Sequence, residues 1–261
     1  MNISDIYLTY FSATYSTRKV LRTIAQQISE NITEYDITQS APETEVVLEE
    51  DDLLIVGMPV YAGRIPLKAA EVLGRFKGKG GPAIIICVYG NRDYDDALLE
   101  LKDITESNGF KVISAGVFIA QHSIFPKVGT DRPDEGDLEL IKDFADKSAG
   151  LLRSVTDLDT LPDLYVKGNV PYKIPGNIPL KPKGNKHCNE CGTCVKLCPV
   201  YAIHEDTPRK TDKEKCISCG RCIVVCPQKA RSFNGLLYKI AGNKFVKANS
   251  ARKEPETFFR V

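Results

Sequence analysis

Two similar segments carry eight of the nine cysteines: CNECGTCVKLCP at Cys188–Pro199 and CISCGRCIVVCP at Cys216–Pro227. Both have the spacing Cys-x2-Cys-x2-Cys-x3-Cys-Pro, and the second follows the first after 28 residues. Two-residue gaps allow three thiolates to surround one cubane cluster from a tight loop, while the fourth cysteine points away. The spacing therefore predicts two [4Fe–4S] clusters.

The fourth cysteine of each run is expected to ligate the cluster of the other run, as this motif does in two-cluster proteins. The glycine after each second cysteine permits close approach of the backbone. Two zinc sites are disfavoured, because structural zinc is held by separated Cys-x-x-Cys pairs around one ion. The predicted ligand sets are Cys188, Cys191, Cys194 and Cys226 for cluster 1, and Cys216, Cys219, Cys222 and Cys198 for cluster 2.

Residues 185–234 resemble the bacterial two-cluster ferredoxins in this tandem motif. The resemblance implies a small α+β domain that carries electrons. The ninth cysteine, Cys87, stands alone in an apolar run and is interpreted as a buried hydrophobic residue. Clustered cysteines that bind metal also predict a reducing compartment, here the cytoplasm.

Short apolar runs alternate with amphipathic periodicity in the first 155 residues. This alternation predicts an α/β domain with a doubly wound parallel sheet of five strands. Strands are expected at 6–11, 32–37, 53–57, 83–88 and 112–120, and helices at 18–28, 66–76, 94–108 and 134–154.

Ligands of doubly wound sheets bind at the carboxyl ends of the strands. The loop after the first expected strand holds four hydroxyls, Ser12, Thr14, Ser16 and Thr17, which with helix N–H groups would form an anion cradle. The same hydroxyls are also suited simply to cap a helix. Two later loops combine aromatic and polar residues, and the NAD fingerprint G-x-G-x-x-G is missing from the first turn.

Three segments, FSATYST, GMPVYAGRIP and YGNRDYDDA, make residues 1–155 resemble the flavodoxin half of flavodoxin–ferredoxin fusion proteins. The resemblance implies FMN, with phosphate in the first loop and the ring beside the later loops. Tyr15 stands where the family usually has glycine. The implied FMN-binding residues are Ser12, Thr14, Tyr15, Ser16, Thr17, Pro59, Val60, Tyr61, Ala62, Gly63, Tyr89, Gly90, Asn91, Arg92, Tyr94 and His122.

Several of these side chains also have simpler interpretations. Tyr61 and Tyr94 are as easily explained as half-buried loop aromatics, and His122 is interpreted first as a loop hydrogen bonder. Arg64 and Arg92 would serve as surface charges, although Arg92 is also placed to offset the charge of a reduced flavin.

The expected layout is a flavodoxin-like FMN-binding domain at 1–155, a proline-rich linker at 156–184, the ferredoxin-like domain at 185–234 and a docking tail at 235–261. The net charge of +1 conceals an asymmetry. Residues 1–160 hold 16 Lys and Arg against 26 Asp and Glu, or −10, whereas residues 161–261 hold 19 against 8, or +11. The basic ferredoxin-like domain is therefore expected to dock over the flavin edge of the acidic flavodoxin-like domain.

The sequence predicts an electron-transfer protein that passes electrons between FMN and two [4Fe–4S] clusters and links one- and two-electron partners. The alternatives are a flavin-dependent reductase of a quinone or nitro compound, and a redox sensor or assembly factor with structural clusters. The expected partners are redox proteins, with no nucleic acid and no membrane. Docking within one chain and a head-to-tail homodimer both remain open, with the dimer slightly favoured. No signal peptide or apolar span of about 18 residues is evident.

Overall fold

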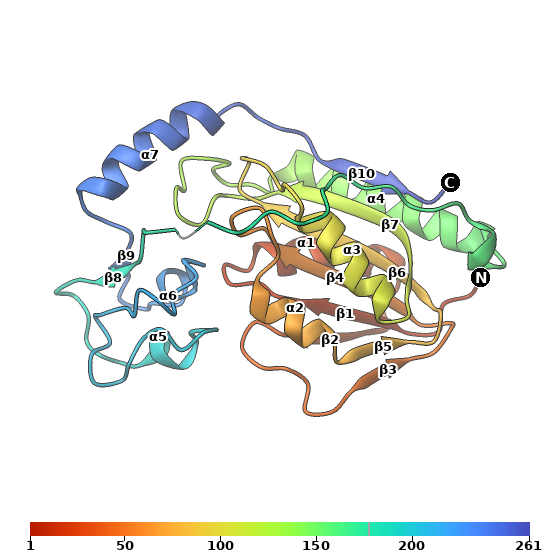
Figure 1. Ribbon diagram of the computed structural model, residues 1–261, viewed down its shortest axis with the longest axis horizontal. Helices are drawn as coiled ribbons and strands as arrows, with labels where there is room; N and C mark the ends of the chain where they lie inside the picture. The colour runs from red at the N-terminus through yellow and green to blue at the C-terminus, as the bar shows by residue number, and fades with distance from the viewer. Residues whose placement is uncertain (177) are drawn as a thin grey trace.

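The computed structural model describes residues 1–176 and 178–261, and a six-stranded sheet is its largest element (Figure 1). The strands of this sheet are β1 (Ile6–Tyr10), β2 (Ile32–Asp36), β4 (Leu53–Pro59), β6 (Pro82–Tyr89), β7 (Lys111–Ile119) and β10 (Glu256–Phe259). Their spatial order is β10-β7-β6-β4-β1-β2. Five strands of this sheet, β1, β2, β4, β6 and β7, pair in parallel, and the order reverses at β1. This is the order 2-1-3-4-5 of the flavodoxin-like fold, so the predicted fold class is confirmed.

Helices cover both faces of the sheet, which is why β6 is buried along its whole length. The helices α1 (Ser16–Ile28) and α4 (Glu135–Ser154) share one apolar cluster with one face. The helices α2 (Leu67–Leu73) and α3 (Ala97–Ser107) share another cluster with the opposite face. Two short strands, β3 (Val46–Leu48) and β5 (Phe76–Gly78), form a separate parallel pair.

The cysteine-rich segment, residues 185–234, lies beside the carboxyl ends of the parallel strands (Figure 1). Its short helices are α5 (Thr193–Lys196) and α6 (Arg221–Val224), and β9 (Arg231–Ser232) pairs with β8 (Lys183–Gly184). Each helix begins after a glycine in the left-handed region, with φ of 74° at Gly192 and 79° at Gly220. A side chain at these positions would be strained, which explains glycine after each second cysteine.

The linker lies along the N-terminal domain and is tied to it by hydrogen bonds. Asp96 accepts bonds from the backbone of Asn169 at 2.9 Å and from that of Lys173 at 2.6 Å. A short 3-10 helix, η1 (Leu158–Thr160), lies near the start of this linker, just after α4. The linker therefore holds the cysteine-rich segment close to the domain from which it extends.

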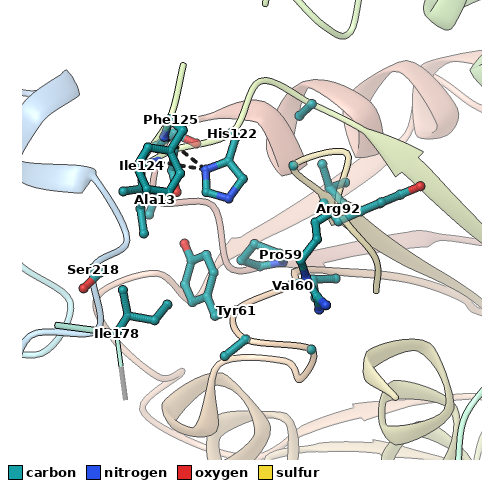
Figure 2. A pocket seen from close by; sticks show the side chains of 18 of the residues that line it. Ala13, Pro59, Val60, Tyr61, Arg92, His122, Ile124, Phe125, Ile178 and Ser218 are labelled. Atoms are coloured by element: carbon teal, nitrogen blue, oxygen red, sulfur yellow. Dashed lines mark hydrogen bonds between the residues drawn. The ribbon is translucent and has the colours of Figure 1, made fainter. Parts of the chain in front are cut away.

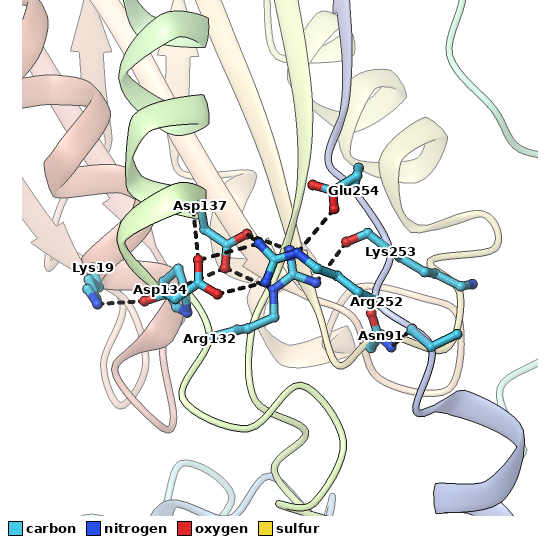
Figure 3. A network of polar contacts seen from close by, with 10 residues as sticks. Lys19, Asn91, Arg132, Asp134, Asp137, Arg252, Lys253 and Glu254 are labelled. Atoms are coloured by element: carbon cyan, nitrogen blue, oxygen red, sulfur yellow. Dashed lines mark hydrogen bonds and ion pairs between the residues drawn. The ribbon is translucent and has the colours of Figure 1, made fainter.

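The tail contains the expected docking helix, α7 (Leu236–Asn249), and then the strand β10, which the sequence analysis did not predict. β10 pairs antiparallel with β7 and adds a sixth strand to the sheet. Figure 3 shows how the segment between α7 and β10 is anchored to the start of α4: Arg252 donates to Asp134 at 2.7 Å and to Asp137 at 3.1 Å. Arg132 links Asp137 to the tail, because it also donates to the Lys253 carbonyl at 2.7 Å.

Within the described parts of the chain, none of the helices combines the length and apolarity needed to cross a bilayer.

Candidate functional site

A cavity of about 410 Å³ opens at the carboxyl ends of the parallel strands, where loops after β1, β4, β6 and β7 meet (Figure 2). This size suits a cofactor-sized ligand. Twelve of the sixteen residues predicted to bind FMN line it: Thr14, Ser16, Thr17, Pro59, Val60, Tyr61, Ala62, Gly63, Tyr89, Gly90, Arg92 and His122.

The hydroxyl loop leaves donors free at the start of α1. The Ser12 hydroxyl accepts the backbone N–H of Arg18 at 3.0 Å, so Ser12 supports the loop from outside the cavity. Among the described residues, the N–H groups of Ser16 and Thr17 have no hydrogen-bond acceptor. Unpaired amides at a helix start attract anions, so this loop fits a phosphate group rather than a fully capped helix.

Tyr15 lies outside the cavity, contrary to its predicted place among the cofactor-binding residues. Its backbone adopts φ of 66°, in the left-handed region that favours glycine. Its ring is 42% exposed and stacks on Arg221, whose guanidinium carbon lies 4.7 Å from the ring centroid. The ring thus packs toward the cysteine-rich segment instead of a ligand.

Asn91 and Tyr94 also lie outside the cavity, because both bind the C-terminal tail. The Asn91 amide donates to the carbonyls of Asn249 and Ala251 at 2.7 and 2.8 Å. Tyr94 is 1% exposed and donates to Glu256 at 2.8 Å. These two residues hold α7 and β10 in place, a role that depends on contacts about 160 residues apart in sequence.

A tight turn presents Tyr61 to the cavity. The backbones of Tyr61 and Arg64 exchange hydrogen bonds of 2.8 and 3.2 Å, and a side chain at Gly63 would collide with Asp95. Burial raises the pKa of Tyr61 well above its usual value, and Cys219 adds to the rise. Tyr61 is therefore a neutral phenol between the cavity and a cysteine of the predicted cluster 2.

The two arginines near the cavity differ in role. Arg64 forms a two-pronged ion pair with Glu100, with both contacts at 2.7 Å, and so fixes the turn rather than contacting the cavity. Arg92 lines the cavity and pairs with Asp95. Of the two, only Arg92 is placed to face a bound group.

His122 is a neutral cavity residue held in one orientation. Its Nδ1 accepts the backbone N–H groups of Ile124 and Phe125, both at 3.1 Å, so the proton resides on Nε2 (Figure 2). Burial, with a smaller effect of Arg92, lowers the pKa of His122 to about 4. His122 therefore forms hydrogen bonds within its loop, as one of its two interpretations predicted, and its Nε2–H remains available as a donor.

Replacing His122 with asparagine should make the protein less sensitive to acid. The unfolded imidazole takes up a proton near pH 6.5 but the folded one only near pH 4, so stability falls as pH decreases through this range. Between pH 7 and pH 5 the loss is about 2 kcal/mol, at about 1.4 kcal/mol per pH unit below 6.5. Asparagine retains an acceptor for the loop amides. Denaturant midpoints at both pH values test this, with exposed His204→Asn as control, and equal pH slopes for His122→Asn and the unmodified protein would contradict it.

The C-terminal half completes the cavity wall within the same chain. Its lining residues include Ile178 of the linker, Ile217 and Ser218 of the cysteine-rich segment, and Phe245 of α7. The Phe245 ring lies 4.7 Å from that of His122. Segments of the C-terminal half thus lie at the cavity, and that this edge is a flavin edge stays a prediction. Phe245 and Ile178 had no sequence motif to identify them.

In the described part of the chain, the ion pairs to the acidic domain come from the linker and the tail, and not from the ferredoxin-like segment as expected. Among the described residues, no ion pair joins 1–155 to 185–234; the direct contacts include hydrogen bonds to carbonyls, such as Arg221 to Ala13 at 3.3 Å, and the stacking of Tyr15 on Arg221. Ion pairs instead connect the acidic domain to the linker and tail, as in Lys167 with Asp93 at 2.9 Å. The basic charges therefore fasten the flanking segments.

The eight clustered cysteines surround two small hollows. One is lined by Cys188, Cys191, Cys194 and Cys226, and the other by Cys198, Cys216, Cys219 and Cys222. These are the two crosswise groups predicted from the motif; that they ligate clusters stays a prediction. Among the residues the structure describes, no three His, Cys, Asp or Glu are arranged to hold a single metal ion.

Donors around the hollows fit a sulfur-rich anionic group. Backbone N–H groups point at the fourth cysteines, with Ala202 to Cys198 Sγ at 3.3 Å and Ala230 to Cys226 Sγ at 3.2 Å. Two buried arginines, Arg221 and Arg231, each have an Nε–H with no partner among the described residues. Each of them lines one hollow. The sequence analysis missed both, although Arg221 lies between two ligands of one Cys-x-x-Cys pair.

Residues 187–231 match a protein family described as the 4Fe-4S dicluster domain. The chain joins a flavodoxin-like domain to a 4Fe–4S ferredoxin-type domain. The dicluster domain contains every cysteine of the two hollows. Iron–sulfur chemistry beside a flavodoxin-like fold supports a redox role in electron transfer. The search of curated proteins gives no match.

Solved structures similar to this chain include flavodoxins. A flavodoxin from Archaea is 12% identical, with 57% of this chain and 99% of that chain covered and a TM-score of 0.39. Flavodoxin 2 from Bacillus cereus is 13% identical over 57% and 99%, with a TM-score of 0.43. The rubredoxin oxygen:oxidoreductase of Desulfovibrio gigas is 15% identical over 59% of this chain, which spans 37% of its length, with a TM-score of 0.39. The fold assignment rests on the strand order described above.

Proposed function

We propose that the protein transfers electrons between FMN in the cavity and two [4Fe–4S] clusters in the dicluster domain, and thereby links two-electron and one-electron redox partners. One observation carries the proposal: the cavity is lined both by the flavodoxin-like loops and by Ile217 and Ser218, which lie between two cysteines of cluster 2. When bound, FMN exchanges one or two electrons, and each cluster exchanges one.

The protein's own residues would bind and orient these groups. Thr14, Thr17 and the first amides of α1 would bind the phosphate of FMN. Tyr61 would lie between the flavin and Cys219, with its phenol held neutral by burial. His122 would donate a hydrogen bond from Nε2, because its Nδ1 is occupied by loop amides.

The two cysteine groups differ in exposure, and this difference supports different positions for them in the transfer. In the group of cluster 2, Cys198, Cys219 and Cys222 are buried. In the group of cluster 1, Cys191 is exposed. We therefore propose that cluster 2 exchanges electrons with FMN and that cluster 1 exchanges them with a redox protein partner.

Flash photoreduction of the anaerobic, cofactor-loaded protein tests the proposal. Reduced flavin formed in the flash should decay as the cluster absorbance bleaches, at a rate that does not depend on protein concentration, because the groups share one chain. A flavin that stays reduced while the clusters remain oxidised would contradict the transfer. Turnover of a quinone or nitro compound that persists after cluster removal would favour the reductase instead.

A further inference from the structure

Arg231 is a buried cation in the dicluster domain. It lies on β9 and is 2% exposed. Its guanidinium donates to the carbonyls of Pro208 and Pro182, the latter at 3.2 Å, and to the Thr211 hydroxyl. These three partners are neutral, so they fix the orientation of the side chain without balancing its charge.

Among the described residues, no carboxylate pairs with Arg231, and its Nε–H has no partner. A buried, unpaired charge is costly unless an opposite charge lies nearby. The surrounding apolar and neutral groups do not provide one. The arrangement therefore indicates that a negative group belongs within reach of this guanidinium.

Both cysteine groups lie within the electrostatic reach of Arg231. It lines the hollow of Cys188, Cys191, Cys194 and Cys226. Two of its hydrogen-bond partners, Pro182 and Thr211, line the hollow of Cys198, Cys216, Cys219 and Cys222. The guanidinium therefore lies against one hollow and is bonded to the wall of the other, so its charge is close to both cysteine groups.

We propose that Arg231 raises the reduction potential of both clusters and lets them hold two electrons at once. This inference rests on the proposed function. Each cluster gains one negative charge when it accepts one electron, and a fixed positive charge nearby in a low dielectric stabilises that reduced form. Because the cation is close to both groups, it also offsets the repulsion between the two added electrons. Two electrons leaving one flavin would then both find a place in the chain.

The test is a potentiometric titration, followed by electron paramagnetic resonance, of anaerobic protein whose iron and sulfide have first been counted. Arg231→Gln should lower both midpoint potentials. At a fixed potential, the ratio of reduced to oxidised cluster should fall by at least about tenfold, which corresponds to about 59 mV for one electron. Arg231→Lys retains the charge and should keep most of the potential.

Two control variants separate charge from structure. Thr211→Val removes a hydrogen bond from Arg231 but leaves its charge, so both potentials should stay near those of the unmodified protein. Arg209→Gln removes a cation that donates to the Cys188 carbonyl at 3.0 Å but whose side chain is 48% exposed. Solvent screens such a charge, so its loss should have a smaller effect.

The outcomes distinguish the inference from the proposed function. An unmodified protein that binds no clusters would refute the function itself. Cluster-loaded Arg231→Gln with unchanged potentials, or Thr211→Val with an equally large shift, would overturn the role of Arg231 alone. If Arg231→Gln does not assemble its clusters, Arg231→Lys decides the question. Midpoint potentials near those of the unmodified protein support the role of charge. A tenfold fall in the ratio of reduced to oxidised cluster refutes it.

Discussion

Replacing Cys198 with serine is expected to remove the cluster of Cys216, Cys219 and Cys222, and to spare the cluster of its own sequence neighbours. The reason is the crosswise grouping, since Cys198 lines the hollow of the second run. Iron and sulfide should fall from about eight to about four of each per chain, as expected for loss of one of two cubanes. Electron transfer from FMN should be lost, because the cluster nearest the cavity is gone.

The matched control is Cys226→Ser, which replaces the fourth cysteine of the other run. Cys226 lines the hollow of Cys188, Cys191 and Cys194, so this variant should lose the same amount of iron. It should nevertheless keep rapid bleaching of the remaining cluster after flavin reduction. If Cys198→Ser retained that bleaching and Cys226→Ser lost it, the crosswise assignment would be wrong.

Thr17→Ala should weaken FMN binding by about tenfold to 150-fold. Thr17 is 1% exposed and lines the cavity at the start of α1. A hydrogen bond to a charged group contributes about 1.5–3 kcal/mol, which corresponds to that range of dissociation constants. Quenching of FMN fluorescence on titration of the apoflavin form measures the change.

Thr23→Ala is the control for this variant, because it makes the same substitution at another threonine of α1. The Thr23 hydroxyl donates to the Lys19 carbonyl at 3.0 Å and is away from the cavity. Its affinity for FMN should match that of the unmodified protein. Equal affinities for the Thr17 and Thr23 variants would show that the loop does not bind phosphate through Thr17, and absence of FMN binding in the unmodified chain would refute the flavin site.

The contacts of the linker and tail have a consequence for how the two domains meet. Lys167 of the linker pairs with Asp93, and Arg252 of the tail pairs with Asp134, both of which belong to the flavodoxin-like domain. β10 completes the sheet edge. The dicluster domain is therefore held between two fastened segments, which places Ile217 and Ser218 at the cavity without a direct ion pair between the domains.

The sequence by itself determined the features that depend on local spacing. Cysteines separated by two or three residues fall into the two groups because a tight loop leaves them few other arrangements. Apolar runs alternating with helical periodicity specify the doubly wound sheet, since its central strands are buried on both faces. Loops after those strands then converge at one edge, so twelve of the sixteen predicted FMN-binding residues line the cavity.

Only the tertiary structure decided the contacts between segments far apart in the chain. Asn91 and Tyr94 have the right position in a loop, but the tail binds their side chains and withdraws them from the cavity. β10 has four residues, too few for a local pattern, and is stabilised by the unpaired edge of β7. The sequence around Arg231 likewise does not reveal that its charge is buried and unpaired. Its burial and its lack of a carboxylate partner arise only when segments distant in the chain enclose it.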